Sequence, residues 1–310
     1  MAAKVLLIGG SRFLGLAIAE AFIGKGYDVH EMNRGTRPSA KGVVEQIVCD
    51  KNDRGAFAAV LKRRRWDIIV DTMLNDEELD FAINTIGSGV GHFIHTGSLG
   101  VYGEARQIPA TEALPLYEYE GDQVVFNYKI KQDQVLMRAF HERGFPGTSL
   151  RMSYIYGPGD IPLDGWGGRS PEFFRMLRDG ETIPLPDDGQ ALLHPGHVKD
   201  LGRAFLHAAE RPISIGQLYN ICGPYALMTK DYVSVIAVAM GVTPRLTFAP
   251  QKDILARFPK FTNERGMKFA CQHMCASIAK AERDLGWRPE IPLAAGMCEN
   301  IAWLRAQGII

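Results

Sequence analysis

The chain contains 310 residues, and its 35 lysines and arginines balance its 35 aspartates and glutamates. Hydrophobic residues make up 46% of the sequence and charged residues 23%, which excludes an intrinsically disordered chain. Zero net charge removes the usual electrostatic basis for non-specific binding to nucleic acids or membrane surfaces. We therefore expect a globular protein with no membrane partner, and nucleic acid is disfavoured as a partner.

The N-terminal segment contains no predicted export signal. Its apolar run spans only residues 5–8 before two glycines, which is too short for a signal peptide or a membrane span. The five cysteines are odd in number and sparse, as is typical of reduced thiols. No metal site is expected, because the segment from Cys271 to Cys275 lacks a second ligand pair. These features together predict a cytoplasmic protein.

Strand-like and helix-like segments alternate through the first half of the chain. Short apolar runs predict strands at residues 4–8, 27–32, 46–49, 66–72, 91–96 and 147–152. Apolar residues at helical spacing predict helices at residues 13–23, 54–65, 77–86 and 124–143. This alternation predicts an α/β fold in which a parallel sheet carries helices on both faces.

The second half is predicted to be less regular. Pro, Gly and Asp are frequent in residues 157–168 and 183–189, which are therefore expected to form loops. Further elements are predicted as helices at residues 198–209, 231–240 and 277–285 and as a strand at residues 216–221.

A glycine-rich segment, GGSRFLG at residues 9–15, lies between the first predicted strand and the first predicted helix. Glycines permit a tight turn and a close approach to a pyrophosphate, and the helix N-terminus offers free N–H groups. This context is the one that a dinucleotide-binding fingerprint requires. We predict that the cofactor is bound by Gly9, Gly10, Ser11, Arg12, Phe13, Leu14 and Gly15.

The end of the second predicted strand indicates which cofactor is used. An acid there binds the ribose 2′-hydroxyl of NAD, whereas a basic residue accommodates the 2′-phosphate of NADP. Asn33 stands where the acid is expected, Arg34 follows it, and Arg12 lies in the glycine loop. The sequence therefore favours NADP over NAD. Asp50, after the next strand, is expected either to bind the adenine amine or to cap a helix.

Five segments spread over almost the whole length form a characteristic series: GGSRFLG at 9–15, TGSLGVYG at 96–103, RMSYIYGPGD at 151–160, HPGHVKDL at 194–201 and KAERDLGWRP at 280–289. In this order the chain resembles the extended short-chain dehydrogenases/reductases of the NAD-dependent epimerase/dehydratase type. Arg12 replaces the family's usual middle glycine, which is most similar to the atypical branch that includes the chloroplast stem-loop-binding proteins.

This resemblance implies the domain organisation. A Rossmann-like, doubly wound dinucleotide-binding domain is expected at residues 1–165 and 191–227. A smaller substrate-binding domain is expected to be built from residues 166–190 and 228–310. Relatives often pair through the long helices of the Rossmann domain, so the resemblance also implies a homodimer.

The family's catalytic set is a Ser or Thr, a Tyr and a Lys. A tyrosine of ordinary pKa is a poor base at neutral pH, and a nearby lysine and the cationic nicotinamide lower that pKa. Ser98 matches the family's hydroxyl position, where it would orient the substrate oxygen. The alternative for Ser98 is a hydrogen bond to nearby backbone at the end of a strand.

The spacing of the tyrosine and the lysine departs from the family motif, which separates them by three residues. Gln132 stands at that spacing from Tyr128, whereas Lys131 lies three positions on, on a similar helix face. We select Tyr128 and Lys131 as the catalytic pair. The alternative alignment makes Lys129 the family lysine, which places Val125 at the tyrosine position.

The resemblance implies an NAD(P)-dependent oxidoreductase or epimerase that acts on a hydroxylated small molecule, sugar-derived molecules included. No Asp-Glu pair follows Ser98, which argues against the 4,6-dehydratase reaction, and no arginine precedes His194 to bind the phosphate of a nucleotide sugar. The alternative is a catalytically divergent binding protein of the same fold. Its RNA contact would be the basic run at residues 62–65.

Overall fold

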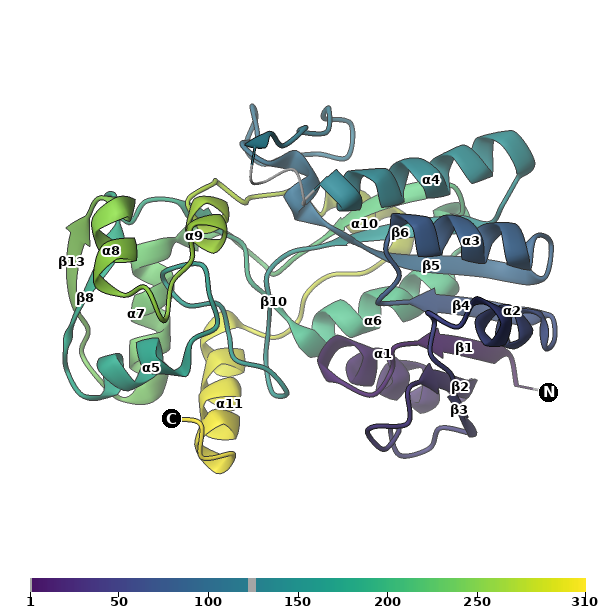
Figure 1. The fold of residues 1–310 in the computed structure, drawn as a ribbon, viewed down its shortest axis with the longest axis horizontal. Coiled ribbons are helices and arrows are strands. Elements are labelled where there is room, and N and C mark those ends of the chain that lie inside the picture. The colour runs from purple at the N-terminus through teal and green to yellow at the C-terminus, as the bar shows by residue number, and fades with distance from the viewer. Residues whose placement is uncertain (1, 122–126) are drawn as a thin grey trace.

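A computed structural model describes residues 2–121 and 127–310, and its centre is a parallel β-sheet. Seven strands lie in the order β11-β6-β5-β4-β1-β2-β3 (Figure 1). Their bounds are β1 Lys4–Ile8, β2 Asp28–Asn33, β3 Glu45–Val48, β4 Trp66–Asp71, β5 Val90–Ser98, β6 Gly147–Met152 and β11 Gln217–Ile221. Every neighbouring pair is parallel, which confirms the predicted α/β fold with a doubly wound sheet.

Helices cover both faces of this sheet. One face carries α1 (Phe13–Gly24), α6 (Val198–Ala209) and α10 (Ala279–Leu285), and the other carries α2 (Arg54–Lys62), α3 (Asp76–Ile86) and α4 (Asn127–Arg143). Alternate residues of β1 enter the two cores: Val5 and Leu7 pack in the first, and Leu6 and Ile8 in the second. A strand buried on both faces needs a continuous apolar run, and this is why β1 was predictable.

A second group of elements lies beside the sheet and has a hydrophobic core of its own (Figure 1). Its core is formed by side chains that include Trp166, Phe173, Phe174, Tyr232, Ile236 and Leu304. Its elements are α5 Pro171–Arg178, β8 Thr182–Pro186, α7 Thr229–Met240, β13 Arg245–Ala249, α8 Gln251–Arg257, α9 Glu264–Ala270 and α11 Leu293–Ala306. Strand β13 pairs with β8 in parallel.

Short elements complete the chain. They are the helical turns η1 Leu99–Tyr102 and η3 Pro212–Ser214 and the strands β7 Ile155–Tyr156, β9 Leu192–Leu193, β10 Gly196–His197 and β12 Leu227–Met228. In the described part of the chain, no helix is long and apolar enough to cross a membrane.

The helix predicted at residues 124–143 is described only from Asn127 onward, so its first residues, Val125 among them, lie outside the described residues. The division into two domains stays a prediction. Helix α10 falls within the range predicted for the smaller domain, yet its Ala281 and Leu285 pack in the core beneath the sheet.

Candidate functional site

A cleft of about 770 Å³ opens where β1, β2, β3 and β4 end. Strand order reverses at this point of the sheet, because β1 lies between β4 and β2, and doubly wound folds bind nucleotides at such a switch point. The cleft is lined by Gly9, Ser11, Arg12, Met32, Asn33, Arg34, Thr36, Arg37, Cys49, Asp50, Lys51, Asn52, Thr72 and Met73.

Three positions of the glycine loop at the base of the cleft require glycine, either because of their backbone conformation or because a side chain would have no room. Gly9 has a φ of +93°, and a Cβ atom on Gly10 would lie 2.7 Å from Leu7 Cδ2. A Cβ atom on Gly15 would lie 2.1 Å from the Gly9 carbonyl oxygen. Helix α1 begins within this segment, at Phe13, and has no acidic residue in its first turn. The loop therefore fits the pyrophosphate of a dinucleotide, which needs close backbone approach and free N–H groups.

Asn33 shapes the turn after β2 with its side chain. Its Oδ1 accepts hydrogen bonds from the Gly35 amide at 2.7 Å and from Gln46 Nε2 at 2.9 Å. Its Nδ2 donates to Glu31 Oε1 at 2.5 Å. The Gln46 amide also donates to the Arg37 carbonyl at 3.0 Å. The carboxamide of Asn33 is thus engaged within the protein, and its observed contacts hold the turn instead of presenting a free group to a ribose.

Four cations border the cleft, and two of them come from segments that the sequence analysis missed. Arg12 and Arg34 were predicted, whereas Arg37 and Lys51 were not. Lys51 pairs with Glu78 on α3. Within the described part of the chain, Arg34 and Arg37 form no ion pair, so their charges face the cleft uncompensated. A basic residue soon after a strand end was the signal that could have found them.

Asp50 lies in the cleft wall, and of its two expected roles it does not take that of capping the helix that follows. Its Oδ1 accepts from the Asn52 amide at 2.9 Å. The residue that caps α2 is Asp53, whose side chain accepts from the Ala56 amide at 3.0 Å. Asp50 therefore remains available along its other oxygen for a ligand in the cleft.

Ser98 is the last residue of β5 and caps the start of η1. Its Oγ accepts a hydrogen bond from the Gly100 amide at 3.1 Å. This is the backbone contact that the sequence analysis considered as the alternative role. A hydroxyl that accepts one backbone bond retains its own proton, so the contact does not prevent Ser98 from donating to a ligand.

The structure does not bring Tyr128 and Lys131 together at this strand end. Lys129 Nζ donates to the Thr96 carbonyl of β5 at 3.0 Å, and it lies 5.2 Å from the Tyr128 ring centre. Lys131 instead lines an outer cavity with acidic residues of α3. Side chains two positions apart on an α-helix point in directions that differ by about 200°, so Lys129 and Lys131 cannot face the same strand. The expectation that selected Lys131 therefore disagrees with the observed helix face.

Burial shifts the pKa values of this pair. It lowers the pKa of Lys129, and the negative charges of Asp71 and Asp133 partly oppose that shift. Burial raises the pKa of the Tyr128 phenol, although 39% of that side chain is exposed. A lysine of lowered pKa releases its proton more readily at neutral pH, whereas Tyr128 stays protonated.

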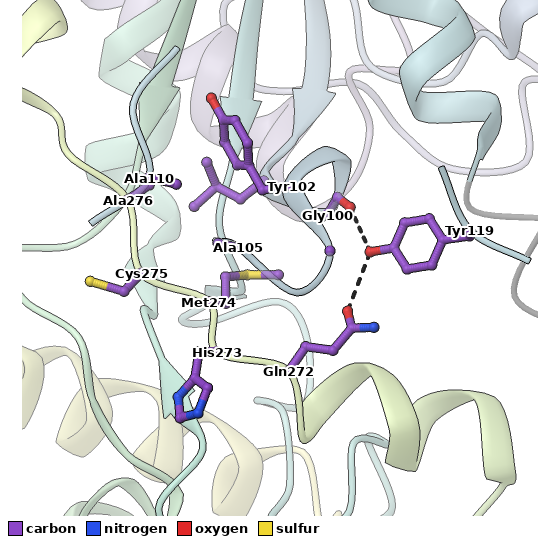
Figure 2. Close-up of a pocket in the computed structure, with 12 residues that line it drawn as sticks. Gly100, Tyr102, Ala105, Ala110, Tyr119, Gln272, His273, Met274, Cys275 and Ala276 are labelled. Carbon is purple, nitrogen blue, oxygen red and sulfur yellow. Dashed lines mark hydrogen bonds between the residues drawn. The ribbon is translucent and has the colours of Figure 1, made fainter. Parts of the chain in front are cut away.

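A second, nearly filled pocket of about 10 Å³ lies beyond η1 (Figure 2). Its walls are Leu99, Gly100, Tyr102, Gly103, Ala105, Ala110, Tyr119, Gln272, His273, Met274, Cys275 and Ala276. Figure 2 shows the Tyr119 hydroxyl donating to the Gly100 carbonyl at 2.6 Å and to Gln272 Oε1 at 3.3 Å. Burial raises the pKa of Tyr119. No acidic or basic side chain occurs among the described residues of this wall, His273 apart.

The family model of the NAD dependent epimerase/dehydratase family matches residues 5–222. The chain belongs to this family. The match spans the whole seven-stranded sheet, together with the glycine loop and Lys129. Membership agrees with the oxidoreductase or epimerase chemistry expected from the sequence.

Curated relatives cover nearly the whole chain. The chloroplast stem-loop binding protein of 41 kDa b from Arabidopsis thaliana is 29% identical, over 96% of this chain and 78% of the relative. The dTDP-L-rhamnose 4-epimerase of Burkholderia thailandensis is 23% identical, over 97% of this chain and 94% of the relative.

Solved structures share the fold. The UDP-glucose 4-epimerase of Stenotrophomonas maltophila with bound NAD has a TM-score of 0.78 at 16% identity and covers 99% of both chains. The dTDP-glucose 4,6-dehydratase of Bacillus anthracis in complex with NAD has a TM-score of 0.75 at 17% identity and covers 100% of both chains. These likenesses establish a Rossmann-type epimerase/dehydratase fold for this member of the family.

Three arginines at or near α5, Arg169, Arg175 and Arg178, are engaged by other groups of the protein. Arg169 donates to the Ile155 carbonyl at 3.1 Å and also to the Ile161 carbonyl. Arg175 donates to the Ile309 carbonyl at 2.8 Å, and Arg178 pairs with its neighbour Asp179 at 2.7 Å. Their guanidinium groups hold backbone and helix ends together.

Proposed function

We propose that this protein is an NADP-dependent oxidoreductase or epimerase that acts on a hydroxylated, sugar-like small molecule. The observation that carries the proposal is the arrangement at the ends of neighbouring strands. The glycine cradle opens into a cleft with uncompensated cations, and Thr72 and Met73, directly after β4, line that cleft. Lys129 and Ser98 both lie at β5, which pairs with β4. When bound, a nicotinamide ring supplies or accepts a hydride.

We assign the roles at the strand end as follows. Ser98 donates its hydroxyl proton to the substrate oxygen. Lys129 takes the part of the family lysine, and burial lowers its pKa, which eases the loss of its proton. Tyr128, beside the Lys129 ammonium group, holds a phenolic proton and supplies the acid. The residue at the family's tyrosine position is Val125, which has no proton to give.

The cofactor preference rests on the turn at residues 33–37. Asn33 and Gln46 fix this turn, and it presents the guanidinium groups of Arg34 and Arg37 to the cleft. A guanidinium binds phosphate oxygens through paired N–H groups, so a fixed pair of arginines favours the 2′-phosphate of NADP.

The substrate is proposed to lack a diphosphate. No arginine stands in residues 189–193, directly before His194, and Arg169 is engaged by backbone carbonyls, so neither supplies a free cation for a diphosphate. Relatives are described as enzymes of dTDP- and UDP-linked sugars, and we expect this chain to take the sugar-like part without the nucleotide.

One experiment tests the proposal. The purified protein is denatured, any released nucleotide is identified by mass, and NADP⁺ and NAD⁺ are then titrated into the cofactor-free protein. We expect NADP⁺ to bind at least about tenfold more tightly, which corresponds to one charge-assisted contact. A panel of free sugars, polyols, UDP-sugars and dTDP-sugars follows, with nicotinamide absorbance as the readout. Failure to bind either dinucleotide would contradict the proposal.

A second candidate function is RNA binding, favoured by the name of the Arabidopsis relative. The basic run at residues 62–65 is partly engaged, since Arg63 pairs with Glu45 at 2.6 Å and Arg64 lies over the Trp66 ring. Anisotropy of a labelled stem-loop RNA at two salt concentrations tests it. Salt-sensitive binding that is lost on neutralising Lys62 and Arg65 would favour this candidate.

We also propose that the protein is a homodimer and that it is cytoplasmic. The long helices α3 and α4 pack against each other, and an outer cavity lies between them. Sedimentation at micromolar concentration tests the dimer, and fractionation of the source cells tests the location.

A further inference from the structure

Arg12 is the charged residue of the glycine loop, and it stands where the family usually has glycine. Its side chain lines the cofactor cleft and is 56% exposed. Its Nη2 lies 3.7 Å from Asp160 Oδ1. An exposed ion pair of this length contributes little to stability, so a ligand of higher charge can displace the carboxylate.

Asp160 is shared between two guanidinium groups. Its Oδ1 faces Arg12, and its Oδ2 lies 3.7 Å from Arg169. One carboxylate cannot neutralise two cations, so this edge of the cleft retains surplus positive charge. If Arg12 turns toward a ligand, Asp160 still has Arg169 as its counter-ion.

The loop that carries Asp160 is held by the C-terminal helix. Asn300 of α11 is fully buried, its Oδ1 accepts from the Gly157 amide at 3.0 Å, and its Nδ2 donates to the Asp160 carbonyl at 3.1 Å. The same loop packs on the start of α1, since a Cβ atom on Gly159 would lie 3.3 Å from Phe13 Cδ2. The Asp160 backbone is therefore held in position beside Arg12, whereas more than half of the Arg12 side chain is exposed to solvent.

We propose that the Arg12 guanidinium binds the cofactor's pyrophosphate and that Asp160 is the counter-ion which it leaves on binding. This inference rests on the proposed function, because it requires a dinucleotide. It assigns Arg12 to the group that NAD and NADP share, whereas Arg34 and Arg37 serve the 2′-phosphate. The expectation that Arg12 contributes to NADP preference is thereby replaced.

The competition between Asp160 and the pyrophosphate gives a distinctive signature. Removing the Arg12 charge weakens both cofactors by the same factor. Removing the Asp160 charge strengthens both, because the guanidinium no longer has to leave a carboxylate. That gain depends on Arg12 and disappears when Arg12 is absent.

The test is a double-mutant cycle on the cofactor-free full chain, with Kd for NADP⁺ and NAD⁺ measured by calorimetry. We expect Arg12→Gln to raise both Kd values about tenfold and Asp160→Asn to lower both about threefold, as loss and gain of charge-assisted contacts require. Asp160→Asn in the Arg12→Gln background should change neither Kd. Arg37→Gln, the matched control, should raise the Kd for NADP⁺ alone.

Each other outcome overturns a stated part. If Arg12→Gln weakens NADP⁺ alone, Arg12 belongs to the 2′-phosphate site and the inference fails. If Asp160→Asn acts equally in both backgrounds, the two residues do not compete and the inference fails. If the unmodified chain binds both dinucleotides and Arg12→Gln leaves both Kd values unchanged, the inference fails alone. If the unmodified chain binds neither, the proposed function fails with it.

Discussion

At the scale of single residues, Lys129 and Lys131 lie only two positions apart on α4, but their side chains point to different sides of the helix. Lys129 reaches the Thr96 carbonyl of β5, and Lys131 points to the outer side of α4. Both residues are lysine, so any difference in activity between variants of Lys129 and of Lys131 results from their positions and not from the residue type. This makes them a matched pair for testing the site.

We expect Lys129→Met to lower kcat by at least about a hundredfold on a substrate found by the panel, since general acid–base groups contribute on this order. Lys131→Met should leave kcat within about twofold of the unmodified chain. The measurement is initial rate against substrate concentration for both variants. Equal losses in the two variants would show that Lys129 has no special role.

Because the His92 side chain is buried, we expect the folding stability of the protein to depend on pH. Burial lowers its pKa to about 4, and its ring nitrogen lies 2.7 Å from Thr148 Oγ1. The Thr148 hydroxyl donates its proton to the Ser214 carbonyl, so the imidazole must donate to Thr148. The buried ring is therefore neutral at neutral pH.

The sign of the effect follows from linkage. An unfolded histidine takes up its proton near pH 6.5, whereas the folded one does so only near pH 4, so stability falls as pH drops through this window. We expect His92→Gln to abolish about 2 kcal/mol of the loss between pH 7 and pH 5. Urea unfolding at both pH values measures it. A variant whose profile runs parallel to that of the unmodified chain would contradict the assignment.

At the scale of elements, the packing of α1 on the glycine loop depends on two bare backbone positions. Gly15 lies against the Gly9 carbonyl, and Gly10 lies against Leu7 and Glu31. At the other end of α1, a Cβ atom on Gly24 would have no neighbouring atom within 4 Å. The same helix therefore offers both a test position and a control.

We expect Gly15→Ala to lower the free energy of unfolding by about 3 kcal/mol and to abolish dinucleotide binding, because α1 must move away from the loop. Gly24→Ala should leave binding intact and keep stability within about 0.5 kcal/mol or raise it. Chemical unfolding and calorimetry on both variants measure this. Intact cofactor binding in Gly15→Ala would show that the loop does not hold the pyrophosphate.

The strands of the central sheet were the predictable part, whereas α5, α8, α9 and α11 were not predicted and the loop predicted at residues 183–189 is wrong, because β8 covers Thr182–Pro186. Strands such as β1 and β4 are buried on both faces, so their apolar runs are visible without any partner. Strand β13 escaped prediction, because three of its five residues are exposed, none is fully buried, and its partner β8 is far away in sequence. Strand pairing of this kind depends on contacts that no local pattern contains.

The site was predictable where backbone chemistry dictates residue type, as in the glycine loop. The site was less predictable where it depends on the direction in which a side chain points from its helix or loop. The face of α4 is revealed by Gln132, Asp133 and Leu136, which are buried and lie three, four and seven positions after Lys129. Two of these three are polar, so hydrophobic periodicity gave no clear face. Arg37 and Lys51 reach the cleft from loops, whose course depends on hydrogen bonds such as the one from Gln46.

At the scale of the whole molecule, the cleft joins four strand ends to the second group of elements through Asp160 and Asn300. A ligand in the cleft therefore contacts segments from distant parts of the chain. A ligand that binds only the folded state stabilises it by mass action.

We expect free NADP⁺ at a hundred times its Kd to raise the free energy of unfolding by about 2.7 kcal/mol. NAD⁺ at the same concentration should raise the free energy of unfolding less, because the stabilisation depends on the logarithm of the ratio of ligand concentration to Kd and the Kd for NAD⁺ is expected to be higher. Thermal unfolding over a series of cofactor concentrations measures both. An unfolding midpoint that does not depend on NADP⁺ concentration would contradict a cofactor role for the cleft.

The turn at residues 33–37 is held by its own hydrogen bonds, and none of these involves Ser98 or Lys129. Substitutions in the turn can therefore change which dinucleotide is accepted without disturbing the residues that face the substrate. A lineage can exchange its source of reducing equivalents while keeping its reaction, and it can alter its reaction while keeping that source. The two properties are free to evolve at separate rates.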